Sequence, residues 1–221
     1  MAETDVSNEP GQHVTLVHTL MLVGCCAILG WLFFFCKPAK VQHYVESEVS
    51  YLGHVVPSSN WHKITYRAGE WYQFLMVDSG VKNAIERTLI PDESSDSLSH
   101  ATSKYSGIVY NVAHNSQILF YQVCFRASVL LYWLLLMAPL IIGFMVDGYY
   151  QWHIKRYTFG HVSTNRYQIW SRIWVALALL ATLYVILPAV TVKLATLYAP
   201  ALLIGMGLVI GQLWSNFQKS F

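Results

Sequence analysis

The chain has few charged residues and few cysteines. Asp, Glu, Lys and Arg make up 12% of its 221 residues, whereas a soluble domain usually carries about a quarter. The net charge of +2 is too small to indicate direct nucleic-acid binding, which needs many basic contacts to phosphates. The four cysteines have neither metal-ligand spacing nor a secreted-domain pattern, so we interpret them as packing residues. The low charge points to a chain that lies in lipid.

Motifs for catalysis and cofactor binding are also missing. No G-x-x-x-x-G-K-[ST] run occurs, which excludes an ATP-driven role of that type, and there is no G-x-S-x-G. No two of the nine histidines lie three or four positions apart, so a helical metal pair is absent. Glu46 and Glu48 are two positions apart and fall on different helix faces. We therefore expect no enzyme activity, no catalytic residue, no metal and no cofactor.

The sequence does contain long apolar runs. Ala127–Val146 and Ile173–Val192 each hold 20 residues without a charge, enough to cross a bilayer core of roughly 30 Å at about 1.5 Å per residue. Val14–Phe35 is a third candidate, and the acidic leader before it does not resemble the basic start of a signal peptide. Each run predicts a membrane-spanning helix.

A fourth helix follows from the length of the last apolar region. This region continues for about forty residues after Ile173, twice the length of one span, so it must fold back. Pro188, Lys193 and Pro200 mark the reversal, because proline disfavours continued helix. The fourth helix is then expected at Tyr198–Trp214.

These runs predict an all-α, polytopic membrane protein with four transmembrane helices and a helical extramembrane loop between the first two. The loop should contain helical stretches at 40–54 and 59–89, because apolar residues recur there at three- and four-residue steps. Its aromatic residues could contact lipid headgroups or a partner, or pack against each other. The expected segments are an N-terminal tail (1–13), a first span (14–36), a loop (37–126) with a mobile linker (91–104) and an amphipathic end (105–126) that continues into the second span, three spans (127–214) with a basic hairpin (147–172), and a C-terminal tail (215–221).

The hairpin sets the expected orientation. It carries Lys155, Arg156, Arg166 and Arg172 against one acid, Asp147. Basic residues in short loops favour the cytoplasmic side, which places both termini in the cytoplasm and residues 37–126 in the periplasm or an equivalent compartment. The basic residues could set topology alone, or they could also bind an acidic partner or phospholipid headgroups.

Two further features involve charge pairing and small residues. Folding the hairpin about Gly160 brings Asp147 near Arg172, so we expect an ion pair that fixes the hairpin. In the last helix, Gly207-x-x-x-Gly211 allows a close helix contact in lipid. That contact could be internal, or it could join two copies of the chain or a partner protein.

At the hairpin the sequence resembles the integrating-conjugative-element membrane protein family, found with transfer genes on bacterial conjugative elements and plasmids. The resemblance lies in ESEVSYLG (46–53), in the Val-Asp-Gly that ends the second span (146–148), in HIKRYTFG (153–160) and in STNRYQIWSR (163–172). It implies a four-helix protein of the bacterial inner membrane that takes part in DNA transfer between cells.

The function expected from this resemblance is that of a non-enzymatic accessory or anchor for the coupling ATPase or the type IV secretion apparatus. Its partners would be the lipid bilayer, membrane proteins of the conjugation machinery and a possible second copy of the chain, without direct contact to nucleic acid. The alternative is a surface-exclusion or regulatory membrane protein carried on the same element, with the 37–126 loop as its recognition surface.

Overall fold

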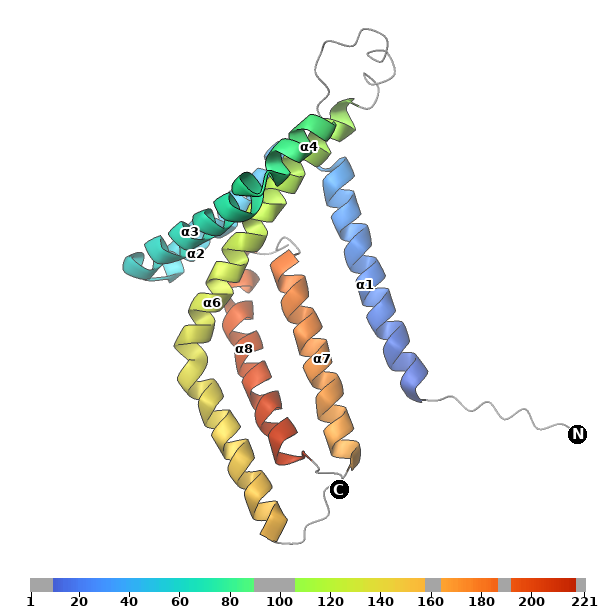
Figure 1. Cartoon of the computed structure of the whole chain (residues 1–221), viewed down its shortest axis with the longest axis vertical. Helices are drawn as coiled ribbons and strands as arrows, with labels where there is room; N and C mark the ends of the chain where they lie inside the picture. The colour runs from blue at the N-terminus through green and yellow to red at the C-terminus, as the bar shows by residue number, and fades with distance from the viewer. Residues whose placement is uncertain (1–9, 90–105, 158–163, 187–191, 218–221) are drawn as a thin grey trace, which may run out of the picture.

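The structure, a computed structural model, describes residues 10–89, 106–157, 164–186 and 192–217, and every element in these ranges is helical (Figure 1). The long helix α6 runs through the molecule and packs against each of the other α-helices. The elements are α1 (Pro10–Phe35), α2 (Pro38–Val55), α3 (Ser58–Tyr72), the π-helical turn η1 (Gln73–Asp78), α4 (Val81–Leu89), α6 (Ser106–Tyr157), α7 (Thr164–Ile186) and α8 (Val192–Ser215).

The helix α6 is continuous from Ser106 to Tyr157, so the predicted end of the loop runs into the predicted second span without a break. It contains 52 residues, with Pro139 inside it. Proline lacks an amide hydrogen and its ring clashes with the carbonyl group four residues earlier, so a helix bends there. Figure 1 shows α6 changing direction partway along its length, which turns its C-terminal part to run beside α8.

Three helices are long and apolar enough to cross a membrane. They contain the segments Gly107–Lys155, Arg166–Ile186 and Leu197–Ser215, and α1 adds a shorter apolar stretch, Cys26–Phe35. The start of α1, the end of α6, the start of α7 and the end of α8 all lie at the same end of the molecule (Figure 1). The all-helical membrane class is therefore supported by three candidate spans, and the fourth span, at α1, stays a prediction.

The last helix begins earlier than the sequence predicts. The sequence predicts a start at Tyr198, after Pro188 and Lys193, but α8 runs from Val192 and contains Pro200. The reason is that Pro200 falls in the interior of an apolar helix that neighbouring helices support, where a missing backbone hydrogen bond is tolerated.

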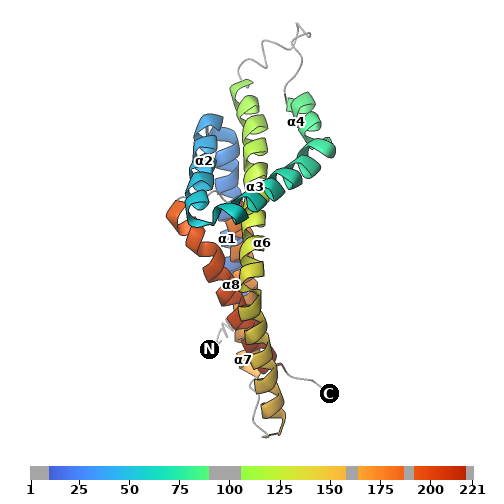
Figure 2. The ribbon, with the colours of Figure 1, turned by 90° about the vertical axis from the view of Figure 1, so that its left-hand side faces the viewer.

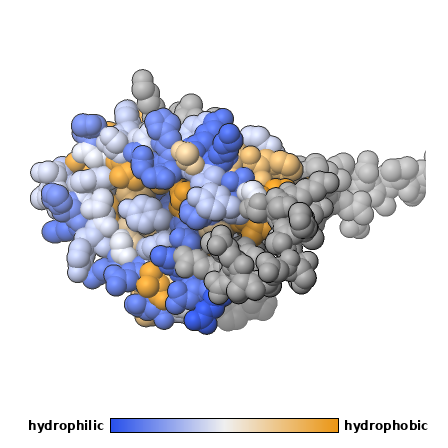
Figure 3. All heavy atoms as spheres, turned by 90° about the horizontal axis from the view of Figure 1, so that it is seen from above, coloured by the Kyte–Doolittle hydropathy of each residue, from blue (hydrophilic) through white to orange (hydrophobic). Residues whose placement is uncertain are grey.

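The opposite end of the molecule is a layer formed by α2, α3 and α4, which cross α6 (Figures 1 and 2). Figure 3 shows this end from above, and its described surface is mostly hydrophilic with small apolar patches. Helices occur in both predicted stretches of the loop, but the second is divided by η1 and by Gly80. Gly80 has φ +76°, a left-handed conformation that glycine adopts without steric strain. The predicted linker 91–104 lies outside the described residues.

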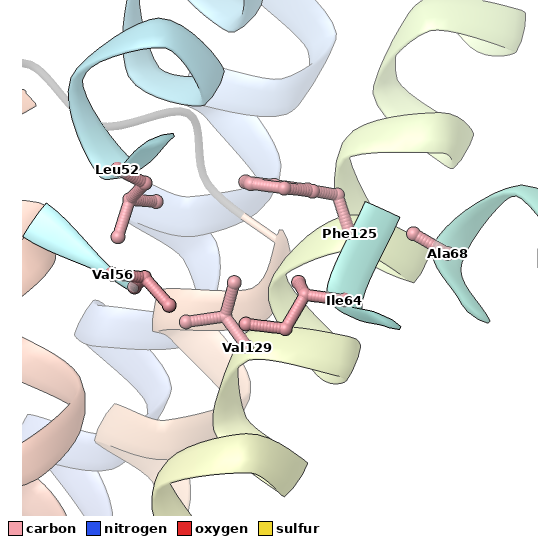
Figure 4. Close-up of a cluster of buried hydrophobic side chains, with 6 residues drawn as sticks. All are labelled: Leu52, Val56, Ile64, Ala68, Phe125 and Val129. Carbon is pink, nitrogen blue, oxygen red and sulfur yellow. The ribbon is translucent and has the colours of Figure 1, made fainter. Parts of the chain in front are cut away.

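The main core lies where this layer meets α6. Figure 4 shows side chains from α2, α3 and α6 converging on one another. Ile64 and Ala68 of α3 and Phe125 of α6 are fully buried. Trp61 packs edge-on against Phe125, with 5.9 Å between the ring centroids. The buried members are Leu52, Val56, Ile64, Ala68, Phe125 and Val129.

Glycines bring α6 and α8 into close contact in the spanning region. A Cβ atom on Gly207 would lie 3.0 Å from the Phe144 ring, and one on Gly211 would lie 2.7 Å from the Phe144 carbonyl oxygen. A Cβ atom on Gly148 would overlap the backbone of Gly211. The Gly207-x-x-x-Gly211 surface therefore packs against α6 of the same chain, which is the internal one of the alternatives that the sequence left open.

A glycine substitution can test this contact. Gly148→Ala should destabilise the protein by about 1–3 kcal/mol, because the added methyl group forces two backbones apart. Gly143→Ala on the same helix is the matched control, since a Cβ atom there meets nothing within 4 Å. Thermal unfolding of both variants in detergent measures the difference. Equal melting temperatures for the two variants would contradict the packing described here.

Candidate functional site

A buried arginine joins three helices where the extramembrane layer meets the spanning helices. Arg126 of α6 is 1% exposed. Its Nε donates to Glu48 Oε1 at 2.8 Å and its Nη2 donates to Glu48 Oε2 at 2.7 Å. Bidentate pairs of this kind are charge-assisted and fix the orientation of both side chains. Arg126 therefore ties α2 to α6.

The third nitrogen of the same side chain binds α7. Arg126 Nη1 donates to the backbone carbonyl of Tyr184, and the guanidinium lies 5.1 Å from the centroid of the Tyr184 ring. Tyr184 is in the last turn of α7, where carbonyl groups have no partner within the helix. A positive charge there also suits the negative end of the helix dipole. Arg126 thus caps α7 while it neutralises Glu48.

The sequence places Glu48 in this position by helical periodicity. The buried residues of α2 are Val41, Val45, Glu48 and Leu52, which recur every three or four positions and form one face. Glu46 is exposed on another face and accepts a hydrogen bond from Gln42. The sequence analysis separated the two glutamates correctly but missed the pairing of Glu48 with Arg126. An acid on an otherwise apolar stripe is a signal that Glu48 is buried, but it does not identify the partner.

Two other polar side chains of α6 cap helix ends in the same way. Asn115 is fully buried, and its amide nitrogen donates to the carbonyl oxygens of Leu32 at 2.9 Å and Cys36 at 2.8 Å, at the end of α1. Lys155 donates from Nζ to the carbonyl oxygen of Ser215 at 3.0 Å, at the end of α8. With Arg126, one helix therefore binds the C-terminal ends of α1, α7 and α8.

Among the predicted hairpin residues that the structure describes, Asp147 binds a neighbour on its own helix. Asp147 accepts a hydrogen bond from Gln151 on its own helix at 2.8 Å. No ion pair between Asp147 and Arg172 is formed among the described residues, so the expected hairpin clamp is absent from the structure. The aspartate side chain is short, so it forms a hydrogen bond more readily with a residue one helical turn away.

The remaining predicted residues divide into three groups. Lys155 binds the end of α8, whereas Arg166 and Arg172 are exposed on α7. Arg156 lies in the last turn of α6, where the structure describes only its backbone, and Gly160 lies outside the described residues. Within the described ranges no group of three His, Cys, Asp or Glu side chains could hold a metal ion. The hydrogen bonds of Asn115, Arg126 and Lys155 instead connect different helices.

A double-mutant cycle can test the buried ion pair. Arg126→Met or Glu48→Leu alone should lower the free energy of unfolding by about 3–5 kcal/mol, since each leaves an uncompensated buried charge. The double variant should recover much of this loss, but not the cap on α7. Thermal unfolding of all four proteins in detergent gives the coupling energy. Losses that simply add in the double variant would refute a direct pair.

Comparison with known proteins assigns the chain to a family. The family model described as IncC plasmid conjugative DNA transfer protein DtrJ-like matches residues 36–218. No curated protein and no solved structure matches the chain. The matched range begins at the end of α1 and includes Glu48, Arg126 and the whole of α8. It confirms the resemblance to membrane proteins of conjugative transfer, and the chain belongs to the DtrJ-like family of conjugative DNA transfer proteins.

Proposed function

We propose that the protein is a non-enzymatic, inner-membrane component of the conjugation apparatus that supports the coupling ATPase or the type IV secretion channel. Its family is involved in conjugative DNA transfer, and its three long apolar helices suit a membrane protein. Both termini and the basic hairpin face the cytoplasm in this proposal, and the α2–α4 layer faces the periplasm. The exposed Arg166 and Arg172 support that orientation.

The observation that carries the proposal is the Arg126 connection. A protein that anchors another component must keep its membrane part and its extramembrane part in a fixed relation. Arg126 binds α2 and the end of α7 at once, and the core around Phe125 fixes α3 beside them. The fold thus supports a role in positioning a partner at the membrane.

Because the glycine surface of α8 is occupied internally, a partner helix would have to bind elsewhere. The apolar end of α1 is the surface we favour: Trp31 is 58% exposed, Phe34 50% and Phe35 72%. These side chains project from a helix whose C-terminal end is capped by Asn115. In lipid, close packing of such side chains can contribute to helix association.

Affinity purification from donor membranes tests this function. A tagged full-length protein should recover the coupling ATPase or a secretion-channel subunit from cells that carry the conjugative element. The variants Trp31→Ala and Leu208→Ala provide a matched comparison, since both side chains are exposed but only Trp31 lies on α1. Recovery should fall for Trp31→Ala alone. Purification of neither component by the wild-type protein would overturn the proposal.

One observation favours the second candidate, a surface-exclusion or regulatory protein. The turn η1 exposes apolar side chains in the extramembrane layer, with Phe74 69% exposed and Leu75 46% exposed. Such a surface could recognise a protein on another cell. Mating experiments separate the two functions, because deletion in the donor abolishes transfer under the first and expression in the recipient blocks transfer under the second.

A further inference from the structure

The helices α2 and α3 form a hairpin whose tip projects beside the spanning helices. Figures 1 and 2, at right angles to each other, both place this tip level with the upper end of α8. Helix α2 also contacts α8 directly. If α7 and α8 span the bilayer, their upper ends mark its surface. The tip therefore lies at the height of the lipid headgroups.

Around the tip of this hairpin the charge is of one sign. Residues 49–69 contain no Asp or Glu, but they contain Lys63 and Arg67 together with His54 and His62. Across the whole chain acidic and basic residues are nearly balanced, at 12 and 14. The absence of acids over this stretch is therefore a local feature of the part of the layer nearest the spanning helices.

The exposed face of α3 combines this charge with an amphipathic side chain. Ile64 and Ala68 are fully buried on one face, which leaves Tyr66 on the opposite face, 69% exposed. A shallow hollow, widely open to solvent, lies here and is lined by His62, Lys63, Thr65 and Tyr66. At the end of α2, Val55 is 50% exposed. Tyrosine and lysine with an apolar neighbour are typical of a membrane–water interface.

We propose that the α2–α3 tip is a binding surface for anionic phospholipid headgroups, with Lys63 as its principal charge. The hollow can accept a lipid phosphate beside the lysine ammonium group, while Val55 and Tyr66 enter the boundary between headgroups and acyl chains. The nearest acid on the same face, Glu70, accepts a hydrogen bond from Tyr66, and its carboxylate raises the pKa of that tyrosine. Glu70 lies one turn further from the tip and does not line the hollow.

This surface is distinct from the basic hairpin between α6 and α7. The end of α6 and the start of α7 lie at the other end of the spanning helices, so the basic residues there would contact the opposite leaflet. Lipid contact at the tip would prevent the layer from tilting away from the membrane. Contact between the tip and lipid requires no partner protein of the conjugation apparatus.

Hydrogen–deuterium exchange of the full-length protein in vesicles tests the lipid surface. One set of vesicles contains phosphatidylcholine alone and the other phosphatidylcholine mixed with phosphatidylglycerol. In the mixed vesicles, amide exchange in residues 54–66 should slow by about fivefold, the factor that one basic residue contributes near an anionic surface. Lys63→Gln should abolish that difference. Arg87→Gln, an exposed position at the end of α4, is the matched control and should retain it.

Each outcome of the exchange experiment either supports or overturns the proposed lipid surface. A difference between vesicles that disappears in Lys63→Gln and persists in Arg87→Gln supports the proposal. Equal exchange of the wild-type tip in both vesicles overturns it, as does an equal loss in the two variants. Protection that appears only in donor membranes would assign the tip to a protein and also overturn it. Since the vesicles contain no transfer proteins, failure here leaves the purification experiment unaffected.

Discussion

The paired charges of Arg126 and Glu48 are the interaction on which the rest of the structure depends. Both side chains are almost completely buried, at 1% and 3% exposure, where an unpaired charge would be strongly unfavourable. Each charge therefore requires the other, and α2 must lie against α6 in one register. Because Arg126 also binds the Tyr184 carbonyl, the same constraint fixes the end of α7. The extramembrane layer and the spanning helices thus form one unit.

The polar side chains of α6 extend this principle along the helix. Asn115, Arg126 and Lys155 each donate to backbone carbonyl oxygens at the C-terminal end of a different helix. Carbonyl groups at helix ends lack internal partners, and leaving them without hydrogen bonds away from water is costly. A single long helix therefore organises the fold by binding three helix ends.

Much of the fold could be predicted from the sequence, because apolar runs and helical periodicity are local signals. The continuation of residues 105–126 into the second span followed from the absence of any breaker. The pair of Glu48 and Arg126 could not be predicted this way, since the residues are 78 positions apart and meet only once α2 folds back on α6. The sequence likewise identified Gly207 and Gly211 as contact residues, but it could not distinguish α6 of the same chain from another molecule.

The most direct test of the account is the distance between α2 and α7. Spin labels at His43 and Thr182, both exposed, can be introduced after replacement of the native cysteines and measured by pulsed electron resonance in lipid. The wild-type background should give one narrow distance distribution, and Arg126→Met should broaden it markedly while α-helix content stays the same. An equally narrow distribution in both proteins would contradict the central role of Arg126.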